Sequence, residues 1–288
     1  DNKGWTPAHF AAQDGHGKVI TALYNEGVNL TIPNNEGWTP AHIAAANGQI
    51  EVMSALIDAG TDLTIPTKDG WTPAHIAADK GHLEVLKVLI EAGEKLDIPN
   101  NNGWTPVNIA AEKGHLEVVK VLIEAGAKLD IPNNDGSTPA NNAARNGHVE
   151  VIRALRKAGA NLNIANKYDV TPAYHAAVNG HAEVMMELIT AGININFQDS
   201  ENGWTPVNIA ANKGHLEVLK VLIKAKANLD IPNNTGWTPV NNAAEKGHVE
   251  VLMALIEAKA DLNISTDEGW TPANIAADKG HLEVLKVL

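Results

Sequence analysis

The string Gly-Trp-Thr-Pro recurs along the chain at a nearly constant interval, and this periodicity limits the fold more than any other feature. Seven intact copies begin at Gly4, Gly37, Gly70, Gly103, Gly203, Gly236 and Gly269. Degenerate copies begin at Gly136 and Asp169, and successive copies lie 33 residues apart except for one interval of 34. A repeat this short cannot bury its apolar surface alone, so tandem copies are expected to stack into a solenoid with a continuous core.

Each repeat has the pattern of two short helices followed by an extended turn. Thr6 suits the N-cap of a helix, and Pro7 suits its first position. Apolar residues recur at three- and four-residue spacing over residues 82–90, which predicts a second helix with one buried face. Residues 96–103 are rich in Asn and contain Pro and Gly. They predict an extended, hairpin-like finger that joins consecutive repeats.

These residues resemble the ankyrin repeat. Residues 70–78, the pair Gly81-His82 and residues 89–93 follow the order of the family's Thr-Pro-Leu-His-x-Ala, Gly-His and Leu-Leu-x-x-Gly-Ala motifs. The resemblance covers the whole chain. It implies an all-α solenoid of helix-turn-helix repeats with β-hairpin-like finger loops, curved so that fingers and first helices line a concave face and second helices form a convex one. The chain departs from the family in its motif His, which survives only as His9, His42 and His75.

The resemblance implies a single ankyrin-repeat domain over residues 1–288. The expected repeats are 1–33, 34–66, 67–99, 100–132, 133–165, 166–198, 199–232, 233–265 and a truncated 266–288. Because no initiator Met is present and the last repeat stops inside its second helix, we expect the chain to be part of a longer array or protein.

The periodic residues leave almost nothing for catalysis. Of the twelve histidines, eight directly follow the mid-repeat Gly and three occupy the His position of the Thr-Pro-x-His pattern. Only His175 lies outside both positions. Histidines at equivalent positions of stacked helices would lie about 10 Å apart, too far to share a zinc ion. The chain contains no cysteine, no phosphate-binding loop and no nucleophile elbow. We therefore expect no enzyme activity, no cofactor and no metal site.

Charge and hydropathy narrow the class of partner. The net charge of −12 disfavours nucleic acid and anionic membrane surfaces as partners. No apolar run approaches the ~18 residues that a membrane span needs, so no direct membrane insertion is expected. The leading expectation is a non-enzymatic, cytoplasmic protein-protein interaction scaffold that binds a partner protein or peptide on its concave face. A monomer is expected, with end-to-end stacking as an alternative.

Three other functions remain open at this stage. The chain could be a structural or elastic spacer array, in which surface identity hardly matters. It could be the targeting module of a larger protein with catalysis elsewhere, such as a bacterial effector acting in the host cytosol. It could also bind glycans along its tryptophans, which all occupy one repeat position.

The tryptophan stripe and its interruption in the middle of the chain suggest where a partner binds. The indoles could pack on neighbouring fingers or form a row of binding hot spots, for which Trp is favoured. Arg145 and Tyr174, with nearby fingers, are expected to give specificity, unless these repeats have simply drifted. The candidate partner-binding residues are Trp38, Trp71, Trp104, Ser137, Asn141, Arg145, Val170, Tyr174, Trp204 and Trp237.

Other departures from the repeat give expectations about packing. Asn142 and His175 replace apolar residues and should hydrogen-bond to each other if they are buried on adjacent helices. Arg156 replaces an isoleucine and must either extend to solvent or find an anion. Lys226 and Lys259 replace a helix-ending Gly, where a left-handed residue with a side chain costs ~1–2 kcal/mol.

Overall fold

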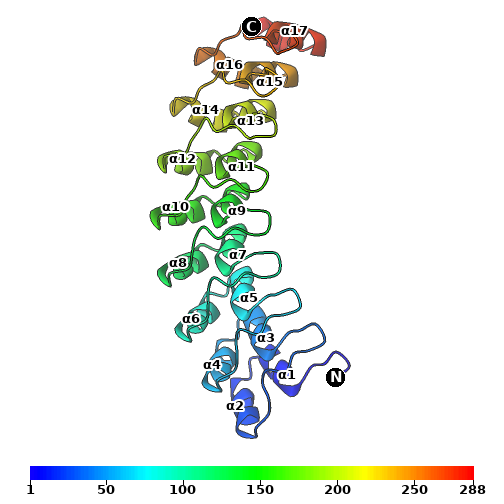
Figure 1. Ribbon diagram of the computed structural model, residues 1–288, viewed down its shortest axis with the longest axis vertical. Helices are drawn as coiled ribbons and strands as arrows, with labels where there is room; N and C mark the ends of the chain where they lie inside the picture. Colours follow the sequence, from blue (N-terminus) through cyan, green and yellow to red (C-terminus); the bar gives the residue numbers. More distant parts are fainter. The chain divides into compact units, whose positions relative to one another are not determined.

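The computed structural model describes residues 1–288 and contains eighteen α-helices and no β-strand, arranged as helix pairs (Figure 1). The first helices of the repeats are α1 (Pro7–Gln13), α3 (Pro40–Asn47), α5 (Pro73–Lys80), α7 (Pro106–Lys113), α9 (Pro139–Arg145), α11 (Pro172–Asn179), α13 (Pro206–Lys213), α15 (Pro239–Lys246) and α17 (Pro272–Lys279). The second helices are α2 (Gly17–Asn25), α4 (Ile50–Asp58), α6 (Leu83–Glu91), α8 (Leu116–Glu124), α10 (Val149–Lys157), α12 (Ala182–Thr190), α14 (Leu216–Lys224), α16 (Val249–Glu257) and α18 (Leu282–Val287). The all-helical repeat fold expected from the sequence is confirmed.

The chain divides into two compact units. The N-terminal unit comprises residues 1–139 and 157–160, and the C-terminal unit comprises residues 140–156 and 161–288. In the N-terminal unit α1, α3, α5 and α7 pack successively, as do α2, α4, α6 and α8. In the C-terminal unit α11, α13, α15 and α17 pack in the same way, as do α12, α14, α16 and α18. Packing within each unit is therefore between neighbouring repeats, as in other solenoids.

Small residues on the first helices and larger ones on the second build the core. Ala77 and Ala78 of α5 are completely buried, and so are Leu86 and Leu89 of α6. Thr72 has the extended backbone of an N-cap, and proline occupies the first position of the helix that follows. Caps, proline and apolar periodicity thus all specify the same helix boundaries.

The histidine that precedes most of the second helices ties one repeat to the one before it. His82 Nε2 lies 3.1 Å from the carbonyl oxygen of Ala46, and its ring covers Gly48. A Cβ at Gly48 would lie 3.0 Å from that ring. The φ of Gly48 is 68°, in the left-handed region, so both the close contact and the backbone conformation favour glycine there. His115, His181, His215, His248 and His281 make the same contact.

Two expectations about unusual residues hold. Lys226 and Lys259 are left-handed, with φ of 61° and 65°. Arg156 finds an anion, because its guanidinium lies 3.3 Å from a carboxylate oxygen of Glu187 on the next second helix.

The expected hydrogen bond between Asn142 and His175 is wrong. Asn142 is only 1% exposed, yet neither its side-chain nitrogen nor its side-chain oxygen has a partner. The two residues occupy equivalent positions one repeat apart, and packed helix axes are about 8–10 Å apart, a distance that a short amide does not span. The buried amide of Asn142 is therefore left unsatisfied.

None of the helices has the length and apolarity needed to cross a bilayer.

Candidate partner-binding face

Each finger fixes the tryptophan that follows it. The side-chain oxygen of Asn34 accepts hydrogen bonds from the backbone N–H groups of Glu36 and Trp38, each at 2.9 Å. The backbone N–H of Asn34 donates to the carbonyl of Trp38 at 2.8 Å, closing a hairpin-like turn. Asn100 and Asn233 hold Trp104 and Trp237 in the same way. We call the side of the repeats that carries the fingers, the first helices and these indoles the Trp face.

Neighbouring fingers are also bonded to each other. The backbone N–H of Asn35 donates to the carbonyl of Lys3 at 3.0 Å, and its side-chain amide donates to the carbonyl of Asn2 at 3.1 Å. The amides of Asn101, Asn134 and Asn234 repeat this contact in their own fingers. In the finger that carries the extra residue, the hydroxyl of Ser200 donates to the carboxylate of Asp169 instead. The spacing of the indoles within each unit is thus set by hydrogen bonds between neighbouring fingers, from both backbone and side chains.

A buried histidine beneath each of the first three tryptophans links successive repeats. Nδ1 of His42 accepts from the backbone N–H of Thr39 at 3.0 Å, and Nε2 lies 2.9 Å from the carbonyl of Trp71 in the next repeat. His75 makes the equivalent contacts. Burial lowers the pKa of both imidazoles from 6.5 to about 4, so both are neutral at physiological pH. They are structural groups with no free nitrogen for catalysis.

Asparagine performs the same task in later repeats, a role that the sequence analysis missed. The side-chain oxygen of Asn208 accepts from the N–H of Thr205 at 3.0 Å. Its amide nitrogen donates to the carbonyls of Ile231 and Trp237, both at 3.2 Å. The amide therefore reproduces both ends of the histidine bridge without an ionisable group. The recurring exchange of His for Asn after Thr-Pro was the available signal.

The tryptophans are partly packed and partly exposed. The indole and imidazole centroids of Trp38 and His42 are 6.1 Å apart, and those of Trp71 and His75 are 6.0 Å apart. Trp38, Trp71, Trp104, Trp204 and Trp237 are half-buried, while Trp270 is 40% exposed. Each of the first indoles thus rests on its own repeat and still presents surface to solvent.

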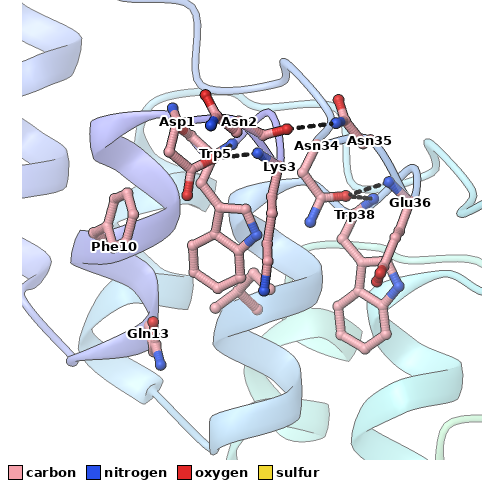
Figure 2. Close-up of a pocket in the computed structure, with 11 residues that line it drawn as sticks. Asp1, Asn2, Lys3, Trp5, Phe10, Gln13, Asn34, Asn35, Glu36 and Trp38 are labelled. Atoms are coloured by element: carbon pink, nitrogen blue, oxygen red, sulfur yellow. Dashed lines mark hydrogen bonds between the residues drawn. The ribbon is translucent and has the colours of Figure 1, made fainter.

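An open groove of about 600 Å³ lies between the first two tryptophans (Figure 2). Trp5 and Trp38 form its sides, and Phe10 and Ile43 add apolar lining. The side chain of Lys3 runs down between the two indoles. A second groove of about 530 Å³ beside Trp270 is lined by Glu268, Asn274 and Asp278.

Two candidate residues of the C-terminal unit, Arg145 and Tyr174, lie on its first helices. Arg145 is exposed at the end of α9, and Tyr174 and His175 are half-buried on α11. Burial lowers the pKa of His175 to about 4, and the positive charge of Arg145 lowers it further. Burial raises the pKa of Tyr174, and the charges of Asp199 and Glu201 raise it further. Val170 is half-buried.

Two of the candidate residues do not present their side chains to solvent. Ser137 is 3% exposed and Asn141 is fully buried. The amide nitrogen of Asn141 donates to the carbonyls of Ile164 and Val170 at 3.2 and 3.1 Å, so it serves the bridge between repeats. No group of three or more His, Asp or Glu side chains is placed to hold a metal ion.

Stacked helix pairs, hydrogen-bonded fingers and the His or Asn bridge define a helical repeat protein of the ankyrin class. The family model for ankyrin repeats in three copies matches residues 1–67, 59–133, 92–166, 126–199, 141–233, 173–266 and 208–288. The chain belongs to the ankyrin repeat family. It is similar to the crystal structure of the human ASB11 ankyrin repeat domain, with 27% identity and a TM-score of 0.68 over 75% of this chain and 97% of that one. No curated protein matches the chain.

Proposed function

We propose that the chain is a non-enzymatic scaffold that binds a partner protein or peptide on its Trp face, which the family resemblance implies to be concave. Ankyrin repeats are generally protein-protein interaction modules. The observation that carries the proposal is the row of half-exposed indoles, held at fixed spacing by finger contacts and opening into a groove between Trp5 and Trp38. Aromatic side chains on a pre-organised frame are typical binding hot spots, because little entropy is lost when they are covered.

Arg145 and Tyr174 support a second contact region on the Trp face of the C-terminal unit. Arg145 is exposed, and the half-buried Tyr174 lies near the carboxylates of Asp199 and Glu201. A mixed aromatic and charged surface of this kind favours a polar partner segment. Specificity would then differ between the two units.

Selection of displayed random peptides on the full chain tests the proposal. Enriched peptides should lose at least tenfold in affinity when Trp71 and Trp104 are both changed to Ala, because hot-spot truncations cost ~2 kcal/mol or more. Ile50→Ala is the control, since Ile50 is 43% exposed on a second helix. Circular dichroism checks that each variant is folded. Peptides that bind all three proteins equally, or no enriched peptide at all, would favour the spacer array.

A further inference from the structure

The groove between the first two tryptophans already contains a cation from the chain itself. Figure 2 shows the alkyl chain of Lys3 running between the indoles of Trp5 and Trp38, and Lys3 lines the groove while remaining exposed to solvent. A lysine ammonium close to an indole is attracted by the negative face of the ring. The chain thus shows how a basic side chain fits beside a tryptophan of this face.

Lys3 stands two residues before its tryptophan, and no other repeat has a basic residue there. In Figure 2 the side chain of Glu36, at the position equivalent to Lys3, lies beside Trp38 as that of Lys3 lies beside Trp5. The residues at this position in the nine repeats are Lys3, Glu36, Asp69, Asn102, Asp135, Tyr168, Asn202, Thr235 and Glu268. Three tryptophans, Trp38, Trp71 and Trp270, are therefore preceded by a carboxylate where Trp5 is preceded by an ammonium.

A second position lines the grooves from the first helix. Gln13, eight residues after Trp5, lines the first groove, and Asp278, eight residues after Trp270, lines the groove there together with Glu268. Asp79 holds the same position after Trp71, with its side chain 19% exposed. Asp79 pairs with Lys80 at 2.9 Å and with Lys113 at 3.6 Å, but the two lysine side chains are 53% and 51% exposed, so both ion pairs are weak.

We propose that the indoles of Trp38, Trp71 and Trp270, each with the carboxylate two residues before it, accept a lysine or arginine side chain from an extended basic segment of a partner protein. This proposal deepens the proposed function and rests on it. Beside each indole the incoming cation takes the place that Lys3 takes beside Trp5, and the carboxylate two residues before the tryptophan neutralises it. The net charge of −12 steers such a segment toward the chain.

The repeat spacing sets the spacing of basic residues in that segment. Packed helices lie about 8–10 Å apart, so Trp38 and Trp71 present their indoles at about that interval. A polyproline II chain rises ~3.1 Å per residue with three residues per turn, so every third side chain faces the same way at ~9 Å. The N-terminal unit therefore fits a segment with a basic residue at every third position.

Labelled peptides test the proposal on the full chain by fluorescence anisotropy at low salt. The probe is a fluorescein-labelled nonapeptide with Lys at every third position and Pro between. Matched peptides carry norleucine or Glu in place of Lys. The lysine peptide should bind at least about fivefold more tightly than the norleucine peptide, the gain of one exposed cation–π contact, and the glutamate peptide should not bind. Equal binding of the lysine and norleucine peptides would overturn the proposal.

Charge-matched variants distinguish the effect of the carboxylates beside the tryptophans from the effect of the net negative charge of the chain. Glu36→Gln with Asp69→Asn should weaken the lysine peptide about tenfold or more. Glu84→Gln with Glu117→Gln, on second helices, makes the same change in net charge and should weaken it less than about twofold. Lys3→Glu should tighten binding by about fivefold, whereas Lys18→Glu on α2 should not. Equal effects of the paired variants would mean that only net charge matters, and would refute the proposal.

Failure of this inference is distinct from failure of the proposed function. If the affinity of peptides selected by display depends on Trp71 but the peptides show no preference for Lys or Arg, the Trp face binds partners but does not bind basic side chains beside its tryptophans. If the lysine peptide fails to bind while selected neutral peptides bind, the conclusion is the same. If neither kind of peptide depends on the tryptophans, both proposals fall.

Discussion

Glu94 occupies a position where four other repeats have alanine, at residues 127, 160, 227 and 260. It is half-buried, and one of its carboxylate oxygens is inaccessible and has no hydrogen-bond partner. Burial raises the pKa of Glu94 from 4.5 to about 7, and the negative charge of Asp62 adds to this, while Lys95 opposes it. The folded chain therefore binds this proton more tightly than the unfolded chain does.

Glu94→Ala is expected to stabilise the protein in a pH-dependent way. With a raised pKa in the folded state, the contribution of Glu94 to stability is fully present below pH 4.5 and is lost as the pH rises to about 7. Removing the carboxyl should raise the free energy of unfolding by about 1 kcal/mol at pH 8, a value reduced for partial exposure, and change it little at pH 4.5. Urea unfolding at both pH values measures the difference. The same gain at both would show that ionisation is not the cause.

Asn142→Ile is expected to stabilise the C-terminal unit by about 1–3 kcal/mol, because it removes an unsatisfied buried amide. Asn242 provides the control at the equivalent position. It is 2% exposed, but its amide nitrogen donates to the carbonyl of Thr238 at 3.1 Å. Asn242→Ile should therefore gain less than Asn142→Ile in equilibrium unfolding. A loss of stability at Asn142 would mean that its amide has a bound water that offsets burial.

Lys226→Gly and Lys259→Gly are expected to raise stability by about 1 kcal/mol each, because both lysines have left-handed backbone that favours glycine. The two gains should add, since the sites are a full repeat apart. Thermal unfolding followed by circular dichroism measures both. Lys224→Gly, at the last residue of α14, is the matched control and should not raise stability, because Lys224 has helical rather than left-handed backbone.

At the scale of elements, α10 and α12 replace an apolar contact by charges. Arg156 stands where α6 has Ile90, and Glu187 stands where α6 has Val88. Hydrogen bonding to Arg153, at 2.8 Å, is the main reason that the pKa of Glu187 is lowered. Arg153 also pairs with Glu150 on its own helix at 2.5 Å. These charges pair across two consecutive second helices, although Nε of Arg156 and one carboxylate oxygen of Glu187 are buried without a hydrogen-bond partner.

Restoring the apolar pair tests this exchange by a double-mutant cycle. Glu187→Val alone should lower stability by about 1–2 kcal/mol, because it strands Arg156 in a largely buried place. Arg156→Ile together with Glu187→Val should recover that loss, as buried ion pairs can be replaced by packed apolar groups at little cost. The coupling energy from urea unfolding should exceed about 1 kcal/mol. Additive effects would show that the two residues act independently.

At the scale of the whole molecule, the repeats differ in how they link to the next repeat. The first three repeats use His9, His42 and His75, all in the N-terminal unit, whereas later repeats use asparagine, among them Asn108 in the same unit and Asn208 in the other. A histidine whose pKa is lowered in the folded state contributes stability above pH 6.5, and this is lost as the pH falls toward 4. Acid should therefore weaken these links in the N-terminal unit. His175, with a pKa of about 4, adds one such group to the C-terminal unit.

His42→Asn with His75→Asn is expected to protect the N-terminal unit from acid. At pH 5 each wild-type histidine costs about 2 kcal/mol of stability relative to pH 7, given pKa values of 6.5 unfolded and about 4 folded. Amide hydrogen exchange in residues 40–110 should slow at pH 5 in the variant relative to wild type, after correction for intrinsic rates. Unchanged relative protection would contradict the assigned role.

Most of the fold could be predicted from the sequence, because every helix is specified many times by the same local signals. Thr-Pro starts, glycine ends and apolar spacing need no knowledge of the neighbouring repeat. The bridging role of the His and Asn side chains and the position of the Lys3 side chain could not be predicted, since both depend on how a side chain meets the adjacent repeat. The partners of Arg156 and Asn142 were uncertain for the same reason, and only that of Arg156 was anticipated correctly.

The single tryptophan position per repeat has a practical consequence. Ser137 and Val170 show that a repeat can fold without the indole, so six of the seven tryptophans can be replaced and one retained. Each such variant would carry one intrinsic fluorophore at a known repeat. Its emission spectrum would then report the local loosening of that repeat, one repeat at a time along the array.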